Sequence, residues 1–215
     1  AQIIITRNIP EPLAIPDSDR IILLDNQAPK GFGENHNAAF QHCNQPYFCP
    51  LNPDIALQGN PFGVLISEME KSKASIAAPL VVAPTGSVED SVRHFPNLRS
   101  LARKIWGGAD GRYDLKLDDP VFSPDWVAGM SMLFRSADYA RLNGFDRGYF
   151  LYYEDVDICV RAWKAGMKII VCPSVAVVHD ARRDSHRSLR HLRWHLASMG
   201  RYFFKHWGRL PRVVA

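Results

Sequence analysis

Short apolar segments rich in β-branched residues alternate with helix-like segments through the first part of the chain, and no other feature limits the fold as strongly. Strand-like segments cover residues 2–6, 20–24, 47–51 and 75–82. Helices are predicted between them at 34–43 and 60–73, and Asn60-Pro61 supplies an N-cap followed by proline at the first helical position. Strands that alternate with helices indicate an α/β domain with a largely parallel sheet.

The second half of the chain continues this pattern around a long polar segment. Residues 85–124 are interpreted as an excursion that contains one short helix near 98–105. Further strands are predicted at 126–134, 168–172 and 175–178, with a short helix at 136–142. With 215 residues, 47% of them hydrophobic, the chain is long enough for one substantial core.

Composition also limits where the protein is expected to work. No apolar run reaches the roughly 18 residues of a membrane span, and the N-terminus carries no basic-then-apolar signal pattern. The four cysteines form no CxxC pair, so neither a zinc site nor a disulfide framework is indicated. We therefore expect a protein of the reducing cytoplasm.

The positive charge of the chain is concentrated in its last 34 residues. Residues 182–215 contain nine Lys or Arg and one Asp, a net of +8, which leaves −4 on residues 1–181. The tail also carries an apolar stripe at helical spacing, formed by Leu189, Leu192, Leu196, Met199 and Phe203. We therefore predict a domain over residues 1–181 and a basic amphipathic helical tail over 182–215.

Two interpretations of this tail stand side by side. A basic amphipathic helix with aromatic residues can lie on an anionic membrane, which would make the protein peripheral on the inner face of the cytoplasmic membrane. Alternatively, the helix packs on the body and its cations are solvated. Charge alone would also suit nucleic acid, but the sequence carries no recognition motif, so no nucleic-acid partner is expected.

The stretch from Gly144 to Arg161 carries the strongest chemical signal. It passes through an aromatic run and then delivers Glu154, Asp155 and Asp157 at the start of a predicted helix, where the helix dipole favours negative charge. Acids that merely cap the helix are the alternative. Burial beside aromatic side chains can raise a carboxyl pKa toward the range useful for accepting a proton, which makes Asp155 the candidate general base. Asp157 and Arg161, four residues apart, are expected to form a structural ion pair.

Acids at strand ends supply a second candidate site. Asp25-Asn26 and Asp54 follow strands, and ligands of α/β sheets bind beyond the carboxyl ends of strands. Asp54 is presented by Leu51-Asn52-Pro53 and would suit Mg²⁺ or Mn²⁺, which takes one or two protein oxygens and the rest from phosphate and water. His179 ends a strand and could complete a Mn²⁺ site. A turn-capping aspartate and an ordinary strand-end histidine are the alternatives.

A glycine loop precedes the first predicted helix. Gly31-Phe32-Gly33 offers flexible backbone and free N–H groups to a phosphate or a sugar hydroxyl, and Lys30 beside it adds charge. Asn35 and Asn37 are two residues apart on a helix and do not share a face, so at most one of them is expected to line a site.

These segments, in this order, resemble the family 2 glycosyltransferases of the GT-A fold, especially bacterial rhamnosyltransferase-like members. The resemblance covers residues 20 to 180, and each motif is modest evidence alone, whereas the ordered set is strong. The segments that carry it are 29–39, Leu51-Asn52-Pro53-Asp54, 126–130, 144–161, Ala165-Gly166 and Val177-Val178-His179. The fold that it implies is a Rossmann-like, mixed, mostly parallel sheet flanked by helices.

The resemblance implies that a sugar, rhamnose in the most similar branch, is transferred with inversion from a UDP- or dTDP-sugar to a hydroxyl of a glycan or lipid-linked acceptor. Asp155 matches the catalytic base with Glu154 beside it, and Asp54 matches the metal-binding acid. The remaining expected roles are a second metal ligand for His179, donor contacts for Lys30, Gly31, Gly33 and Asn37, and acceptor or sugar contacts for Trp126, Gly129 and Tyr153.

One departure from the family keeps a second hypothesis open. The family's first strand has no evident counterpart here, and Arg7 stands where an acid would follow the second strand. The alternative is therefore a catalytically impaired, glycosyltransferase-like binding or partner protein.

Overall fold

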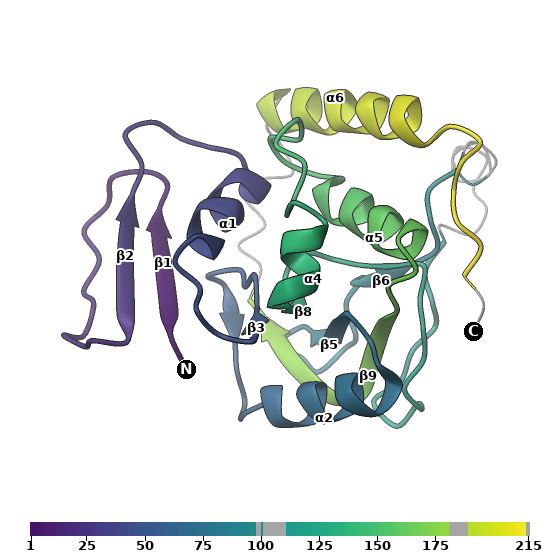
Figure 1. Cartoon of the computed structure of the whole chain (residues 1–215), viewed down its shortest axis with the longest axis horizontal. Coiled ribbons are helices and arrows are strands. Elements are labelled where there is room, and N and C mark those ends of the chain that lie inside the picture. The colour runs from purple at the N-terminus through teal and green to yellow at the C-terminus, as the bar shows by residue number, and fades with distance from the viewer. Residues whose placement is uncertain (98–99, 101–110, 181–188, 214–215) are drawn as a thin grey trace.

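A mixed five-stranded sheet lies between helices in the computed structural model, which describes residues 1–97, 100, 111–180 and 189–213 (Figure 1). The helix α2 (Phe62–Ser72) lies on one side of this sheet. The helices α4 (Ser136–Arg141) and α5 (Glu154–Lys164) lie on the other side. The strand order is β3 (Tyr47–Phe48), β8 (Leu133–Arg135), β5 (Ile76–Val82), β9 (Ile169–His179) and β4 (Ile55–Ala56).

The two central strands show why these apolar runs form a sheet. All seven residues of β5 are buried, and they alternate between the two helical layers. Ile76 and Leu80 belong to the core cluster that contains the apolar face of α5. Ala77 belongs to the cluster that contains Leu65 and Met69 of α2. Burial of both faces explains why β5 reads as a continuous hydrophobic run.

β9 corrects one sequence prediction. Two strands were predicted on either side of Pro173, but the structure has one continuous strand from 169 to 179. β9 pairs with β5 in parallel, and the register shifts after the pair of Pro79 with Cys172, where Leu80 pairs with Ala176. Proline has no N–H for the ladder, so a bulge over residues 173–175, which begins at Pro173, lets the strand continue.

The sheet is mixed as predicted, but the parallel share is smaller than expected. Within the five strands, β5 with β9 is a parallel pair, whereas β3 with β8, β8 with β5, and β4 with β9 are antiparallel. A further parallel pair, β1 (Ile3–Arg7) with β2 (Ile21–Asp25), forms a separate two-stranded sheet beside α1 (Phe32–Phe40).

The predicted strand at 126–134 is two strands joined by a turn. β7 (Trp126–Val127) pairs with β6 (Val92–Arg93), and β8 begins at Leu133. Gly129 lies in the turn between them. The short helix predicted near 98–105 falls almost wholly outside the described residues.

Local side-chain hydrogen bonds fix the start of α2 and the loop before α5. The Asn60 side chain accepts a hydrogen bond from the Phe62 N–H at 3.1 Å, so the predicted cap opens α2. The ion pair predicted within α5 is also present, with Arg161 Nε 2.7 Å from Asp157 Oδ2. Arg161 additionally donates to the carbonyls of Leu142 and Gly144, which fixes the loop that leads to α5.

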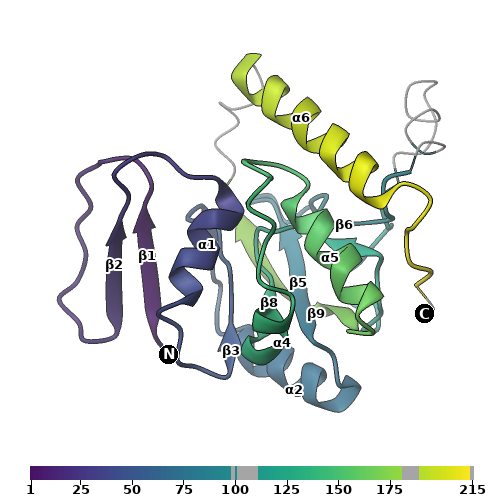
Figure 2. The ribbon, with the colours of Figure 1, turned by 45° about the horizontal axis from the view of Figure 1, so that its top comes forward.

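The C-terminal helix α6 (Leu189–His206) lies across α5, on the side away from the sheet (Figure 2). Tyr202 belongs to the main core cluster, and His206 Nε2 lies 2.8 Å from Asp157 Oδ1. The helix predicted as part of a separate tail is therefore packed on the domain. Within the described residues, no helix combines the length and apolar character that crossing a bilayer requires.

Candidate active site

The proposed base, Asp155, is the second residue of α5 and is oriented by backbone N–H groups. The Gly129 N–H donates to Oδ2 at 3.0 Å, and the Val156 N–H donates to Oδ1 at 2.8 Å. Burial raises the pKa of this carboxyl, while these donors oppose the shift. The residue as a whole is half-buried, and its carboxylate is held in place by these two donors.

Glu154 differs from Asp155 although the two are adjacent. It is only 5% exposed, and its Oε2 has no hydrogen-bond partner among the described residues. Burial, helped by the neighbouring Asp155 charge, raises the pKa of Glu154 to about 8. Of the two carboxyls, only Asp155 receives an N–H donor from the neighbouring strand connection, and this donor favours its charged form.

The turn before these acids is strained and is braced by α6. Tyr152 and Tyr153 have φ of 72° and 65°, a left-handed conformation that costs roughly 1–2 kcal/mol for each such residue. The Tyr152 hydroxyl lies 3.0 Å from His191 Nδ1. Ser198 donates to the Leu151 carbonyl at 2.8 Å. The aromatic run before the acids is thus held by a helix far away in the sequence.

Asp54 and His179 meet at the sheet edge, as a shared cation would require. Residue 55 begins β4 and pairs with His179 of β9, which brings His179 Nε2 to 3.3 Å from Asp54 Oδ2. Asp54 Oδ1 is buried and has no hydrogen-bond partner among the described residues. Two converging ligand atoms with an unpaired carboxylate oxygen fit a cation that completes its shell from phosphate and water.

Glu89 is a member of this group that sequence reasoning missed. Its Oε2 lies 2.7 Å from His179 Nδ1, on the opposite side of the ring from Asp54. A carboxylate at Nδ1 favours the tautomer that leaves the Nε2 lone pair facing outward, the arrangement seen behind metal-bound histidines. The described residues contain no arrangement of three or more His, Cys, Asp or Glu suited to a metal ion. The candidate protein ligands are thus two residues, Asp54 and His179, whose side chains converge.

A short turn links the two halves of the site. Ala128 N–H donates to the Ser91 carbonyl, two residues beyond Glu89. Gly129 N–H binds Asp155. The Met130 carbonyl accepts from the Asn52 N–H, two residues before Asp54. Three consecutive residues, 128–130, thus tie the base to both segments that carry the cation group.

The glycine loop before α1 has a packing role that the sequence did not predict. A Cβ on Gly31 would lie 2.6 Å from the Phe150 carbonyl oxygen, and one on Gly33 would lie 2.5 Å from Phe145 Cβ. The Phe32 N–H donates to the same Phe150 carbonyl at 2.9 Å. These glycines therefore let α1 approach the aromatic stretch before α5. Donor contacts by Gly31 and Gly33 stay a prediction.

Asn37 is occupied by structural hydrogen bonds. Its Oδ1 accepts from the Tyr139 hydroxyl and the Phe145 N–H, and its Nδ2 donates to the Phe145 carbonyl. A Cβ on Gly144, whose φ is +64°, would lie 2.1 Å from Asn37 Oδ1. Because every polar atom of this buried amide has a protein partner, Asn37 has a structural role here, and its expected donor contact stays a prediction.

The neighbouring polar residues form a separate network at the ends of β1 and β2. Asn26 Nδ2 donates to Asn8 Oδ1 and Asn35 Oδ1, and Asn8 Oδ1 also accepts from the Lys30 N–H. Asn35 and Asn37 thus serve different surroundings, as their spacing indicated. The backbone of Lys30 is fixed by this network.

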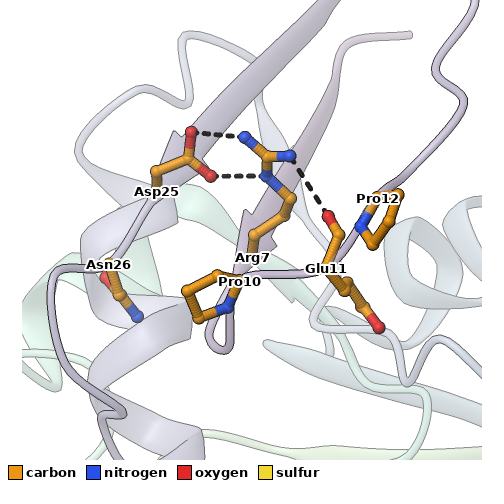
Figure 3. A pocket seen from close by; sticks show the side chains of 6 residues that line it. All are labelled: Arg7, Pro10, Glu11, Pro12, Asp25 and Asn26. Atoms are coloured by element: carbon orange, nitrogen blue, oxygen red, sulfur yellow. Dashed lines mark hydrogen bonds and ion pairs between the residues drawn. The ribbon is translucent and has the colours of Figure 1, made fainter.

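A cavity of about 590 Å³ opens beside the same strand ends (Figure 3). It is lined by Arg7, Pro10, Glu11, Pro12, Asp25 and Asn26. The Arg7 guanidinium forms a fork with Asp25, with Nε–Oδ1 at 2.5 Å and Nη2–Oδ2 at 2.7 Å. Arg7, noted as a departure from the family, therefore neutralises the acid that ends the next strand.

The predicted acceptor residues lie near the base. A Cβ on Gly129 would meet Phe32 Cε1 at 3.2 Å and Asp155 Cβ at 3.4 Å, so glycine permits this close packing. Trp126 starts β7, three residues before Gly129, and its indole N–H donates to the His94 carbonyl. Tyr153 directly precedes the acid pair and stacks near Tyr202. Contacts of these residues with an acceptor stay predictions.

Comparison with known proteins defines the class. A family model described as "Glycosyl transferase family group 2" matches residues 56–210, and the chain belongs to this family. The match includes α5, β9 and α6. A crystal structure of GalNAc-T7 with UDP, GalNAc and Mn²⁺ has the same fold, with a TM-score of 0.60 over 77% of this chain and 33% of that one, at 14% identity.

Two relatives are named as rhamnosyltransferases. Rhamnosyltransferase WbbL of Escherichia coli is 32% identical over 80% of this chain and 69% of its own length. The N-acetylglucosaminyl-diphospho-decaprenol L-rhamnosyltransferase of Mycobacterium tuberculosis is 31% identical over 63% of this chain and 47% of its own length. This chain thus spans about half of the mycobacterial relative. None of these comparisons supports the catalytically impaired alternative.

The buried Glu154 predicts a pH-dependent difference in stability. An unfolded glutamate ionises near pH 4.5, whereas Glu154 keeps its proton up to about 8 in the folded protein. The wild type should therefore lose stability as the pH rises from the unfolded to the folded pKa. Glu154→Gln should be spared this loss, which amounts to a difference on the order of 5 kcal/mol by the upper end of that interval. Urea unfolding of both proteins across the interval measures it, and a constant difference would contradict the assignment.

Proposed function

We propose that this chain transfers a sugar from a nucleotide-diphosphate sugar to an acceptor hydroxyl, with inversion at the anomeric carbon and with Asp155 as the base. The observation that carries the proposal is one carboxylate, oriented by backbone donors, that the 128–130 turn ties to the converging Asp54 and His179. We further propose a rhamnosyl donor carried on UDP or dTDP and a lipid-linked acceptor on the cytoplasmic side of a membrane. The names of the two rhamnosyltransferase relatives support the rhamnosyl group, and that of the mycobacterial relative supports a lipid-linked acceptor.

The chemistry of the step follows from the single base. The acceptor oxygen attacks the anomeric carbon from the face opposite the diphosphate, and its proton passes to the Asp155 carboxylate. The bond between that carbon and the diphosphate oxygen breaks, and its electron pair leaves with the diphosphate. Direct displacement at one carbon inverts its configuration and requires no protein nucleophile. Burial supports the role because a raised pKa makes Asp155 a stronger base.

Asp54 and His179 are the residues proposed to hold a divalent cation, Mg²⁺ or Mn²⁺. Bound there, such a cation supplies positive charge next to the departing diphosphate. Glu89 orients His179 through Nδ1 and leaves Nε2 directed at Asp54. That the GalNAc-T7 structure of the same fold was obtained with Mn²⁺ is consistent with this assignment.

Replacing the base tests the proposed reaction. Asp155→Asn keeps the size of the side chain but cannot accept the proton, so the transfer rate should fall about a hundredfold or more. Transfer is measured as radiolabelled sugar moved from UDP- and dTDP-rhamnose to a lipid-linked acceptor. Asp118→Asn, an exposed aspartate outside the site, is the matched control. An Asp155→Asn protein that folds normally by circular dichroism and still transfers sugar at the wild-type rate would overturn the assignment.

The cation site has a test that does not depend on activity. Glu89→Gln should weaken Mn²⁺ binding in the presence of UDP or dTDP by about 10- to 100-fold, because His179 loses the carboxylate that orients it. Electron paramagnetic resonance of free Mn²⁺ measures the affinity. Glu68→Gln removes only an exposed contact with Lys71 on α2 and should bind Mn²⁺ like the wild type. Equal affinities for Glu89→Gln and the wild type would refute the orienting role.

A further inference from the structure

The helix α6 has two faces, and the apolar stripe noted in the sequence lies mostly on the outer one. Its inner face is formed by Ser198, Tyr202 and His206, which are buried against the domain. On the outer face, Leu189 is 80% exposed and Phe204 is 92% exposed. The other strongly exposed apolar residues here are Leu192, Leu196 and Trp207. We call these five residues the outer stripe.

The outer stripe runs the whole length of the helix. Leu189, Leu192 and Leu196 follow one another at spacings of three and four residues, which places them on one side of a helix. Phe204 follows eight residues after Leu196, and Trp207, just beyond the helix end, is 63% exposed. Both views show α6 at the edge of the molecule, on the side away from the sheet (Figures 1 and 2). Large apolar side chains exposed along a whole helix are typical of a contact site.

The charge around the stripe selects among partners. The 18 residues of α6 include four Lys or Arg and neither Asp nor Glu. Arg201 and Lys205 point to the domain, where both bind Asp146. The exposed arginines near the stripe are Arg190, Arg193, Arg209 and Arg212. Two copies packed stripe to stripe would bring these like-charged arginines close to one another. A surface that is apolar inside and anionic outside matches both features.

We propose that the outer stripe of α6 is a membrane-binding surface that lies in the headgroup region of an anionic bilayer. Leucine, phenylalanine and tryptophan side chains would enter the boundary of the acyl chains, and the flanking arginines would meet lipid phosphates. The helix lies in the plane of the membrane and does not cross it. The inner face stays on the domain through Asp157 and the 151–153 turn.

If the proposed function holds, α6 connects the membrane surface to the active site, because the same helix contacts both. The turn held by His191 and Ser198 directly precedes Glu154 and Asp155. The catalytic pair therefore lies one helix away from the bilayer surface, and the diameter of a helix with its side chains is about 10–12 Å. An acceptor anchored in the membrane by its lipid would present its hydroxyl at this depth.

Vesicle co-sedimentation tests the surface directly. The full chain should bind phosphatidylcholine vesicles that contain about 30% phosphatidylglycerol. Its affinity for pure phosphatidylcholine vesicles should be lower by about tenfold or more. Leu196→Glu/Phe204→Glu should reduce binding to the anionic vesicles about tenfold or more. Both side chains are exposed, so the fold should be kept. Val64→Glu/Leu117→Glu changes two exposed apolar residues off α6 and should bind like the wild type.

The possible outcomes separate this inference from the proposed reaction. Asp155→Asn should bind vesicles like the wild type, so a failure of catalysis leaves the membrane surface intact. Absence of binding by the wild type, or equal binding by the wild type and Leu196→Glu/Phe204→Glu, would overturn the inference. Light scattering tests the remaining alternative, a dimer that forms through the outer stripe. The wild type could be a dimer that does not bind vesicles and that Phe204→Glu converts to a monomer. This outcome would assign the outer stripe to contact with a second copy and overturn the proposed membrane binding.

Discussion

The hydrogen bond from the Gly129 N–H to the Asp155 carboxylate is the interaction on which the site depends. It joins the start of α5 to the turn between β7 and β8. The residues on either side of Gly129 bind the segments that carry Glu89 and Asp54. A Cβ at this position would crowd Phe32 and Asp155, so glycine eases the close packing. One turn therefore sets the position of the base relative to the proposed cation and permits the close approach of α1.

The stability of this arrangement comes from the far side of α5. Asp157 is fully buried and binds Arg161, Lys205 and His206, which keep the pKa of this carboxyl well below its usual range against the cost of burial. Losing one partner of a buried charge typically costs about 3–5 kcal/mol. This cluster fixes α6 on α5, and α6 in turn braces the strained turn at Tyr152 and Tyr153. Catalytic geometry and the outward display of the apolar stripe thus have a common support.

Sequence patterns predicted the parts of the site that depend on local order. Asp155 opens a helix whose apolar spacing is evident, and Asp54 and His179 flank strands that pair at one sheet edge. Glu89 was missed because it lies in a polar segment without periodicity and meets His179 only through the fold. The packing roles of Gly31, Gly33 and Asn37 likewise arise from contacts with residues 139–150. Helical spacing predicted the stripe of α6, but only burial shows which face turns outward.

The central claim is that one carboxylate, Asp155, acts as a base in a direct displacement. The anomeric configuration of the first product tests it most directly, because a base in one displacement gives inversion whereas a protein nucleophile gives retention. Nuclear magnetic resonance of the glycoside formed from a donor of known configuration supplies the measurement. The structure predicts a product whose configuration at the anomeric carbon is inverted relative to the donor. A product with retained configuration would contradict the account, because retention requires a second displacement by a protein nucleophile.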